Sequence, residues 1–205
     1  MVVRIHHKGS LAEQLRICRA VTANPARGYI NVINGEIVID ARFNNYRKAW
    51  VFSEGLAAVL KDDKIGFINE KNEVIIPFLY KYTEDENMYS HSYLFHNGFC
   101  AMANTEGKYG LIDKTGKWAV KPIYDEVWTP HESGYRIIIN DGKYGVLDSI
   151  CNVVYPVEYD DINILSDGFI LNKEGKKWQV DLSAAGTPST FSIATATLND
   201  TERLP

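Results

Sequence analysis

The chain has 205 residues, of which 45% are hydrophobic and 23% are charged, a composition typical of soluble globular proteins. Its 22 basic and 26 acidic residues give a formal net charge of −4, which argues against a general nucleic-acid binder. No stretch approaches the roughly 18 consecutive apolar residues of a membrane helix. Residues 1–8 also lack the apolar core of a secretion signal, so we expect a cytoplasmic protein.

Residues 1–22 predict an N-terminal strand and helix that cap the rest of the fold. Ser10 and Glu13 have the spacing of a helix capping box. An apolar stripe at helical spacing follows, made of Leu11, Leu15 and then Cys18 or Val21. We therefore expect one short helix over residues 11–21.

A six-residue pattern with glycine at its third position recurs along the chain. The clear copies begin at Lys64, Lys108 and Lys143 and read KIGFIN, KYGLID and KYGVLD. Looser copies lie at residues 27–31 and 176–181. The repeat glycines are Gly28, Gly66, Gly110 and Gly145, at intervals of 38, 44 and 35 residues. Self-similarity at this period indicates a repeat architecture.

Further marks keep the same order in successive copies. A turn and an apolar run near a proline follow each hexad, at residues 74–77, 118–122 and 153–156. Tyrosine and two acids come next, at 124–126 and 159–161, whereas Lys81 and Tyr82 replace the acids in the second copy. A glycine then opens a strand; these glycines are Gly55, Gly98, Gly134 and Gly168.

Each copy reads as β structure. Asp141-Gly142 between two apolar runs is a strong hairpin signal, because the turn needs positive φ. The hexad forms the return strand, and a third strand follows, which proline is expected to end because it lacks an N–H. One unit is thus about three antiparallel strands, and it needs stacked neighbours to cover its apolar face.

These motifs resemble the WG (or KWG) repeat family, whose units read roughly G-A-x-V, K-W-G-Y-I-D, a turn with glycine, V-I-P and Y-D. The resemblance covers about residues 24–183. The chain departs from the pattern where Ile65, Tyr109 and Tyr144 replace the tryptophan before the glycine. The resemblance implies a bacterial β-rich module that has no shared catalytic activity and offers an interaction surface.

The predicted fold is an all-β repeat of stacked three-stranded antiparallel units, either an open solenoid-like stack or a closed propeller-like ring. The repeats occupy residues 23–183, with units at about 24–63, 64–107, 108–142, 143–175 and a partial one at 176–183. Residues 184–205 are rich in Ser and Thr and form either a capping strand or a disordered tail.

Few residues suggest catalysis or metal binding. The recurrence of Asp125-Glu126 and Asp160-Asp161 once per unit favours turn chemistry over acid–base catalysis. The five histidines and the widely spaced Cys18, Cys100 and Cys151 lack the spacing of a metal site, and we expect packing roles for the cysteines. We predict no catalytic residue, metal or cofactor. The tyrosines Tyr109, Tyr124, Tyr144 and Tyr159 favour packing between units over a ligand-stacking ladder.

One departure from periodicity predicts the functional site. The span from tyrosine to the strand-opening glycine is 18 residues from Tyr80 to Gly98, against 10 and 9 in the next two copies. Insertions in repeats often lie on the binding face, and aromatic residues and Met anchor interfaces. The predicted partner-binding residues are Tyr82, Glu84, Asp85, Glu86, Met88, Tyr89, His91, Tyr93 and Trp128.

We therefore predict a non-catalytic protein–protein interaction module. Its narrower form is an inhibitor or immunity-type protein that binds a basic toxin or enzyme, with no direct contact to nucleic acid or membrane. An aromatic-lined carbohydrate or cell-wall binding module is the first alternative, and an undescribed enzyme is the second. The oligomeric state stays open.

Overall fold

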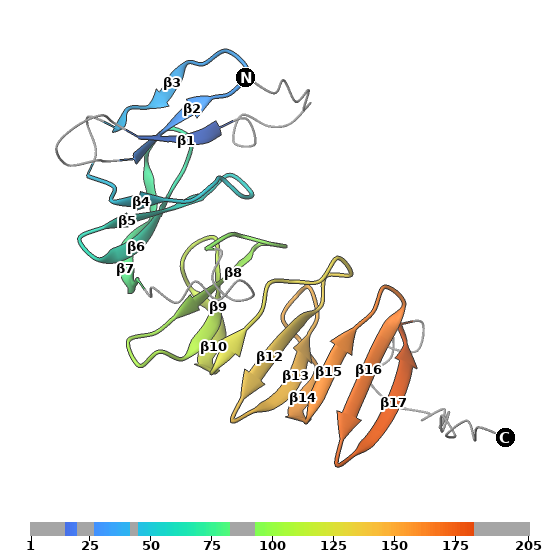
Figure 1. Cartoon of the computed structure of the whole chain (residues 1–205). Helices are drawn as coiled ribbons and strands as arrows, with labels where there is room; N and C mark the ends of the chain where they lie inside the picture. Colours follow the sequence, from blue (N-terminus) through green and yellow to red (C-terminus); the bar gives the residue numbers. More distant parts are fainter. Residues whose placement is uncertain (1–14, 20–26, 42–44, 83–92, 183–205) are drawn as a thin grey trace, which may run out of the picture. The chain divides into compact units, whose positions relative to one another are not determined.

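The computed structural model describes residues 15–19, 27–41, 45–82 and 93–182, and these form only strands and their connections (Figure 1). The prediction of an all-β fold is confirmed. The chain divides into two compact units, residues 1–129 and 130–205. No helix in the described ranges is long and apolar enough to cross a membrane.

The first unit contains the strands β1 (Leu15–Arg19), β2 (Arg27–Asn31), β3 (Ile37–Ile39), β4 (Lys48–Ala49), β5 (Ala57–Lys61), β6 (Lys64–Ile68), β7 (Val74–Lys81), β8 (Phe99–Ala103), β9 (Tyr109–Asp113), β10 (Trp118–Tyr124) and β11 (Glu126–Val127). The second contains β12 (Arg136–Asn140), β13 (Lys143–Leu147), β14 (Val153–Tyr159), β15 (Asp161–Ile164), β16 (Gly168–Lys173) and β17 (Lys176–Asp181).

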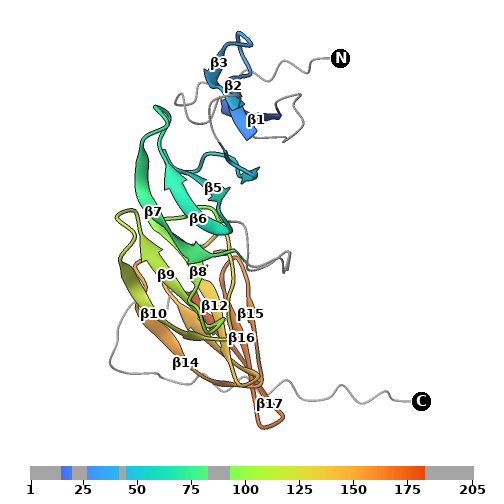
Figure 2. The same ribbon diagram turned by 90° about the vertical axis from the view of Figure 1, so that its left-hand side faces the viewer.

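Small antiparallel sheets make up each unit. The first unit has sheets of order β1-β2-β3, β4-β5-β6-β7 and β10-β9-β8 (Figures 1 and 2). In the second unit β12, β13 and β14 pair in that order, and β15-β16-β17 form the last sheet. The described sheets stay separate and close no barrel. The choice between an open stack and a ring stays a prediction, as do the repeat boundaries.

The predicted N-terminal helix is wrong. Residues 15–19 form strand β1, whose five residues pair with β2 from Leu15 opposite Asn31 to Arg19 opposite Arg27. A short isolated helix is marginal in water, whereas pairing with β2 supplies partners for the backbone groups of this segment. The capping box at Ser10 and Glu13 and the tail at 184–205 lie outside the described residues.

Strand β5 is buried on both faces, which explains its uninterrupted apolar sequence. Ala58 and Leu60 point into a cluster shared with β8 and β9, where they meet Cys100, Met102 and Ile112. Ala57 and Val59 point into the opposite cluster, which includes Tyr29 and Ile39 of the first sheet. The second sheet is therefore packed between its two neighbours, as a stacked repeat requires.

Aromatic rings fill the layer between the two sheets of the second unit. The fully buried Phe169 on β16 makes edge contacts with Tyr155 on β14 and with Tyr135, at centroid distances of 5.1 and 5.0 Å. Burial raises the pKa of Tyr155 to about 12, so its hydroxyl stays protonated. Aromatic packing between neighbouring sheets therefore recurs in this unit.

The repeat glycines are explained by a bulge in the strand that follows. On β6 and β7, Ile65 pairs with Tyr80 and Phe67 with Ile76, so Gly66 alone faces three residues. The same pattern places three residues of β10 against Gly110 and three of β14 against Gly145. A Cβ on Gly110 would fall under 3 Å from three backbone atoms of β10. Only glycine lets the bulged strand approach this closely.

In each of these three repeat copies the proline lies in the bulge and not at the end of the strand. Strands β7, β10 and β14 continue past Pro77, Pro122 and Pro156. The expectation that proline ends the third strand is therefore wrong. A bulge leaves residues outside the ladder, so proline costs no ladder hydrogen bond at this position.

The last residue of each hexad builds the turn to the third strand. Asp113 Oδ1 accepts hydrogen bonds from the backbone N–H groups of Thr115 and Lys117, at 2.8 and 3.0 Å. Asn69 and Asp148 make the same pair of bonds in their own turns. The Thr115 hydroxyl also donates a hydrogen bond to Asp113 Oδ1, and this bond is the largest cause of the lowered pKa of Asp113.

The hairpin predicted at Asp141-Gly142 forms. Asn140 pairs with Lys143, and both residues between them have positive φ, as this two-residue turn requires. The sequence predicted about three strands per repeat copy, but the second sheet has a fourth strand. Lys48 and Ala49 form this strand, β4, and pair with Leu60 and Val59 of β5.

Candidate functional site

Three of the nine predicted site residues lie in the described part of the chain. These are Tyr82, Tyr93 and Trp128. The other six lie outside it, namely Glu84, Asp85, Glu86, Met88, Tyr89 and His91. The site is therefore built from the residues that bracket the insertion and from those that contact them.

Tyr82 and Tyr93, at the two ends of the insertion, meet on Trp50. The Tyr93 ring makes an edge contact with Trp50 at a centroid distance of 4.8 Å. The Tyr82 ring lies 6.2 Å from Trp50 and 6.5 Å from Tyr93. Such aromatic contacts add to the free energy of burial. We call these three residues, together with Lys48, the aromatic site.

Lys48 supplies the charge of the aromatic site. Its Nζ donates a hydrogen bond to Tyr82 Oη and lies 4.5 Å from the centroid of the Tyr82 ring. A cation over an aromatic face is attracted by the ring quadrupole. This places the ammonium of Lys48 against a half-buried ring at the end of the insertion.

Hydrogen bonds with two neighbouring strands fix the backbone of Trp50. The Trp50 N–H donates to Ala58 O at 3.0 Å, and the Tyr29 hydroxyl donates to Trp50 O at 2.8 Å. Burial raises the pKa of Tyr29, so this donor keeps its proton. Two neighbouring elements therefore hold Trp50 in place independently of any partner.

Tyr93 has an unusual backbone for its size. It is 7% exposed and packs in the cluster of Phe95, Cys100 and Met102, with φ of +44°. A bulky residue in this left-handed region is strained, and strain of this kind often lies at functional sites. Tyr93 is thus a buried and strained residue directly after the insertion.

Trp128 occupies the equivalent of Trp50 in a later copy. Trp50 follows the two-residue strand β4, and Trp128 follows the two-residue strand β11. Its Nε1 donates to Glu126 Oε2 at 2.8 Å. Trp50 and Lys48 were missed from the sequence, although aligning the copies on their strand-opening glycines would have identified Trp50, which precedes Gly55 as Trp128 precedes Gly134.

The recurring acids form ion pairs. Lys108 Nζ lies 2.6 Å from Asp125 Oδ1, and Lys143 pairs with Asp160 in the next copy. The hydrogen bond from Lys143 is the largest cause of the lowered pKa of Asp160. Both pairs join the start of a hexad to the residue after the third strand, a structural role that differs from the turn chemistry predicted for these acids.

The two cysteines whose side chains the structure describes, Cys100 and Cys151, are buried or half-buried. Cys100 is fully buried in the apolar cluster, as its predicted packing role requires, and burial raises the pKa of the half-buried Cys151 thiol. In the described ranges, no group of three or more His, Cys, Asp or Glu side chains is placed to hold a metal ion.

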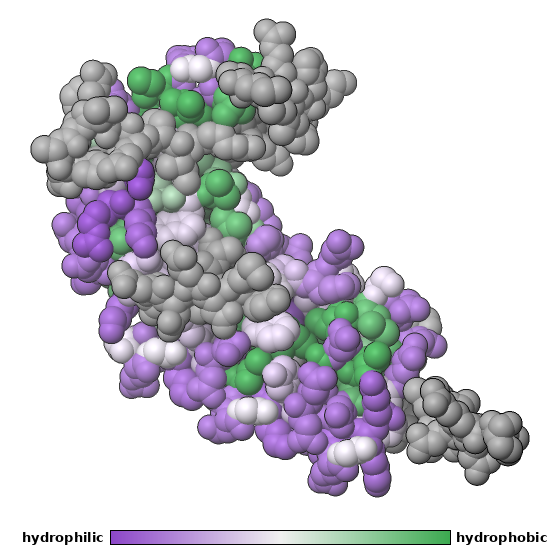
Figure 3. Space-filling view, viewed as in Figure 1, coloured by the Kyte–Doolittle hydropathy of each residue, from purple (hydrophilic) through white to green (hydrophobic). Residues whose placement is uncertain are grey.

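The repeated tyrosines pack and do not form an exposed ladder. Tyr109 is buried, and Tyr159 makes an edge contact with Tyr155 at 5.8 Å. Burial raises the pKa values of Tyr124 and Tyr159. On the face shown in Figure 3, hydrophobic residues appear between hydrophilic ones in both units. Scattered exposed apolar residues such as Leu79 and Ile123 are ordinary on protein surfaces.

A comparison with known families matches the WG containing repeat four times, at residues 28–64, 65–87, 109–144 and 144–178. Together these matches cover more than half of the chain. The chain belongs to the WG repeat family. The second WG match runs through β6 and β7 and includes Tyr82 of the aromatic site.

No curated protein matches this WG repeat chain. Among solved structures, a crystal structure of the eukaryotic initiation factor is similar with a TM-score of 0.33 and 12% identity. The similarity covers 84% of this chain and 61% of that one, so the WG repeat chain spans about six tenths of its length. Similarity this low supports no conclusion about function.

Proposed function

We propose that this WG repeat protein is a non-catalytic module that binds another protein through the aromatic site. Membership of a repeat family, the all-β stack and the site itself support this function. Tryptophan and tyrosine are the residues that most often anchor protein interfaces.

The observation that carries the proposal is the contact between the two ends of the insertion. Tyr82 and Tyr93 bracket residues 83–92 and pack against the same side chain, Trp50. The inserted residues therefore begin and end at one place on the first unit. This place combines aromatic side chains, a lysine and a segment that the other copies lack.

The alternatives have less support. A carbohydrate ladder would need exposed rings, whereas the repeated tyrosines contribute to packing. An inhibitor of a basic toxin rests on the net charge of −4 and on the acids at 84–86, which lie outside the described residues. It remains the narrower form of the proposal.

Affinity capture with Tyr82→Ala tests the proposal. The immobilised chain is incubated with lysate of its source cells, and retained proteins are quantified by mass spectrometry. Trp118→Ala is the control, because Trp118 is also a partly exposed aromatic residue but packs on Tyr80 in the next sheet. We expect Tyr82→Ala to lose a protein that the wild-type chain and Trp118→Ala both retain.

A second variant separates loss of binding from loss of folding. Residues 84–91 are replaced by a Gly/Ser linker, with Tyr82 and Tyr93 kept, and the unfolding midpoint confirms that the chain still folds. We expect the same protein to be lost. Equal retention by both variants and the control would overturn the proposed function.

A further inference from the structure

The ion pair that closes the third and fourth copies is replaced in the second. Lys108 pairs with Asp125 and Lys143 with Asp160, each joining the first hexad residue to the end of the third strand. In the second copy the hexad begins with Lys64, whose partner across the ladder is Lys81. Lys81 thus occupies the position at which an aspartate neutralises the first hexad lysine in the third and fourth copies.

A third lysine extends this pair across the sheet. Lys61 on β5 is the ladder partner of Lys64 on β6, which is the partner of Lys81 on β7. Strand spacing is about 4.8 Å, and directly opposite residues point to the same face. Lys61, Lys64 and Lys81 therefore form a row of three cations, which we call the lysine row.

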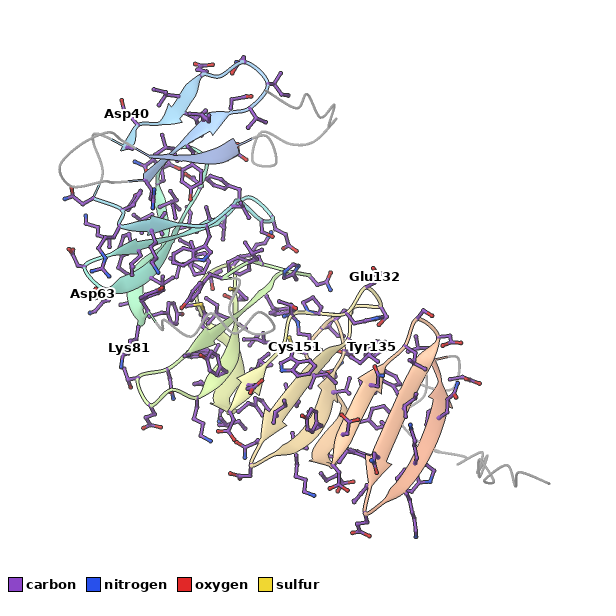
Figure 4. All side chains as sticks on the ribbon, in the orientation of Figure 1. Asp40, Asp63, Lys81, Glu132, Tyr135 and Cys151 are labelled. Carbon is purple, nitrogen blue, oxygen red and sulfur yellow. The ribbon has the colours of Figure 1, made fainter. Side chains whose placement is uncertain are left out.

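No ion pair within the described residues neutralises the lysine row. Lys64 and Lys81 are exposed, and the nearby Asp63 is paired with Arg47 at 2.7 Å. Figure 4 shows Asp63 and Lys81 at the same end of the sheet, with Asp40 well separated from Lys81. Like charges directly opposite on neighbouring strands lower stability. The row therefore costs the isolated chain stability that an anionic partner would restore.

The lysine row is distinct from the aromatic site. Tyr80 on β7 and Tyr82, the residue after β7, pack in the cluster shared with β8 and β9, so Lys81 between them points to the opposite face. On that face the Lys61 Nζ lies 5.9 Å from the Phe78 ring, which stacks on Tyr46 at 6.3 Å. The row thus has an aromatic residue at one end.

We propose that the lysine row binds an acidic segment of a partner protein, with carboxylates opposite the three ammonium groups. A short segment fits better than a nucleic acid, because Asp62 and Asp63 lie in the turn between Lys61 and Lys64. A short segment can place its carboxylates on the lysines alone, whereas a continuous phosphate backbone would also run past these two acids, which would repel it. The proposal does not depend on the aromatic site.

Binding of a poly-glutamate peptide to the full chain tests the lysine row. The double variant Lys64→Gln/Lys81→Gln is compared with Lys108→Gln/Lys143→Gln, which removes the equivalent but ion-paired lysines. We expect roughly tenfold weaker binding in the first variant and little change in the second, and binding that weakens with added salt. Equal loss in both variants, or no binding by the wild-type chain, would overturn the proposal.

Oligo-dT is the competing probe. If it binds the wild-type chain more tightly than poly-glutamate and loses affinity in the same lysine variant, the acidic-protein partner is wrong. Weaker binding of oligo-dT than of poly-glutamate supports the proposal.

The variant Lys81→Asp examines the row without any ligand. It recreates the pair that Lys108 and Lys143 make, so we expect a higher unfolding midpoint and a smaller gain from added salt than in the wild-type chain. An unchanged midpoint contradicts the proposal, since it would mean that the row is already neutralised within the chain. The two proposals can fail separately. If Tyr82→Ala no longer captures the partner protein but still binds poly-glutamate as the wild-type chain does, both proposals stand.

Discussion

The second and third sheets share the same repeat geometry and differ at one end of the sheet. Both have a glycine under a bulged strand and a side-chain oxygen that builds the following turn. Where the third sheet closes with the pair Lys108–Asp125, the second has Lys64 opposite Lys81, followed by the aromatic site. The shared features satisfy geometric needs within each unit. The differences lie at one end of the second sheet, on its two faces, where we propose that the chain binds its partners.

The largest expected effect comes from adding a Cβ to the repeat glycines. In Gly110→Ala the new atom meets the backbone of β10, whereas in Gly66→Ala its nearest neighbour is the Phe78 side chain. We expect Gly110→Ala to lower the free energy of unfolding by about 3 kcal/mol and Gly66→Ala by about 1–2 kcal/mol. Urea denaturation measures both.

Gly107→Ala is the control for this prediction, because open space surrounds the added atom and only the positive φ opposes it. A cost of about 1 kcal/mol is expected there. If Gly107→Ala cost as much as Gly110→Ala, close approach of the bulge would not explain the repeat glycine.

The next effect concerns the contact between the two sheets. Tyr80 Oη donates to Gly116 O at 2.7 Å, which ties β7 to the turn before β10. Tyr80→Phe should cost about 1 kcal/mol because the acceptor loses its partner. Tyr124→Phe, at the equivalent position of the third sheet, should cost less, and thermal unfolding compares the two. A larger loss in Tyr124→Phe would contradict this account of how the sheets are joined.

The turn that Asp113 builds should be more sensitive to acid than the turn that Asn69 builds. The pKa of Asp113 is lowered in the folded chain, so its stabilising contribution is present above the ordinary carboxyl pKa and is lost as pH falls through the lowered value. Asn69 makes the same turn without a titrating group. Asp113→Asn should therefore weaken the dependence of the unfolding midpoint on pH below about pH 4. An unchanged slope would show that this carboxylate does not contribute to acid sensitivity.

The smallest effect is expected for the exposed ion pair of the third copy. Lys108→Gln should cost at most about 1 kcal/mol, because water screens a pair on the surface. The loss should shrink at high salt. A loss that does not respond to salt would mean that Lys108 acts through packing of its stem.

Part of the repeat geometry could be predicted from the sequence, because glycine and turn residues mark local geometry and repetition marks packing positions. The hairpin at Asp141-Gly142 followed from the first signal and the packing role of Tyr109 from the second. Strand β1 did not, because Leu11 and Leu15 fit a helical stripe and only pairing with β2 decides between the two structures. The bulge depends on register between strands, which hexad spacing alone does not determine.

The candidate site could be predicted only in part. The insertion identified Tyr82 and Tyr93 because it breaks the period. Trp50 and Lys48 precede it by more than 30 residues and are brought to it by β4 and β5. Lys81 was visible as the residue that replaces an acid, but its place in the lysine row depends on the pairing of β5, β6 and β7.

Photo-crosslinking compares the two regions most directly. Benzoylphenylalanine replaces either Tyr82 in the aromatic site or Tyr124, a half-buried tyrosine at the end of β10, and the chain is irradiated in its source cells. A partner protein crosslinked from position 82 and absent from position 124 is the result that we predict. Equal crosslinking from both positions, or crosslinking from position 124 alone, would contradict the claim that the second copy carries the interaction site.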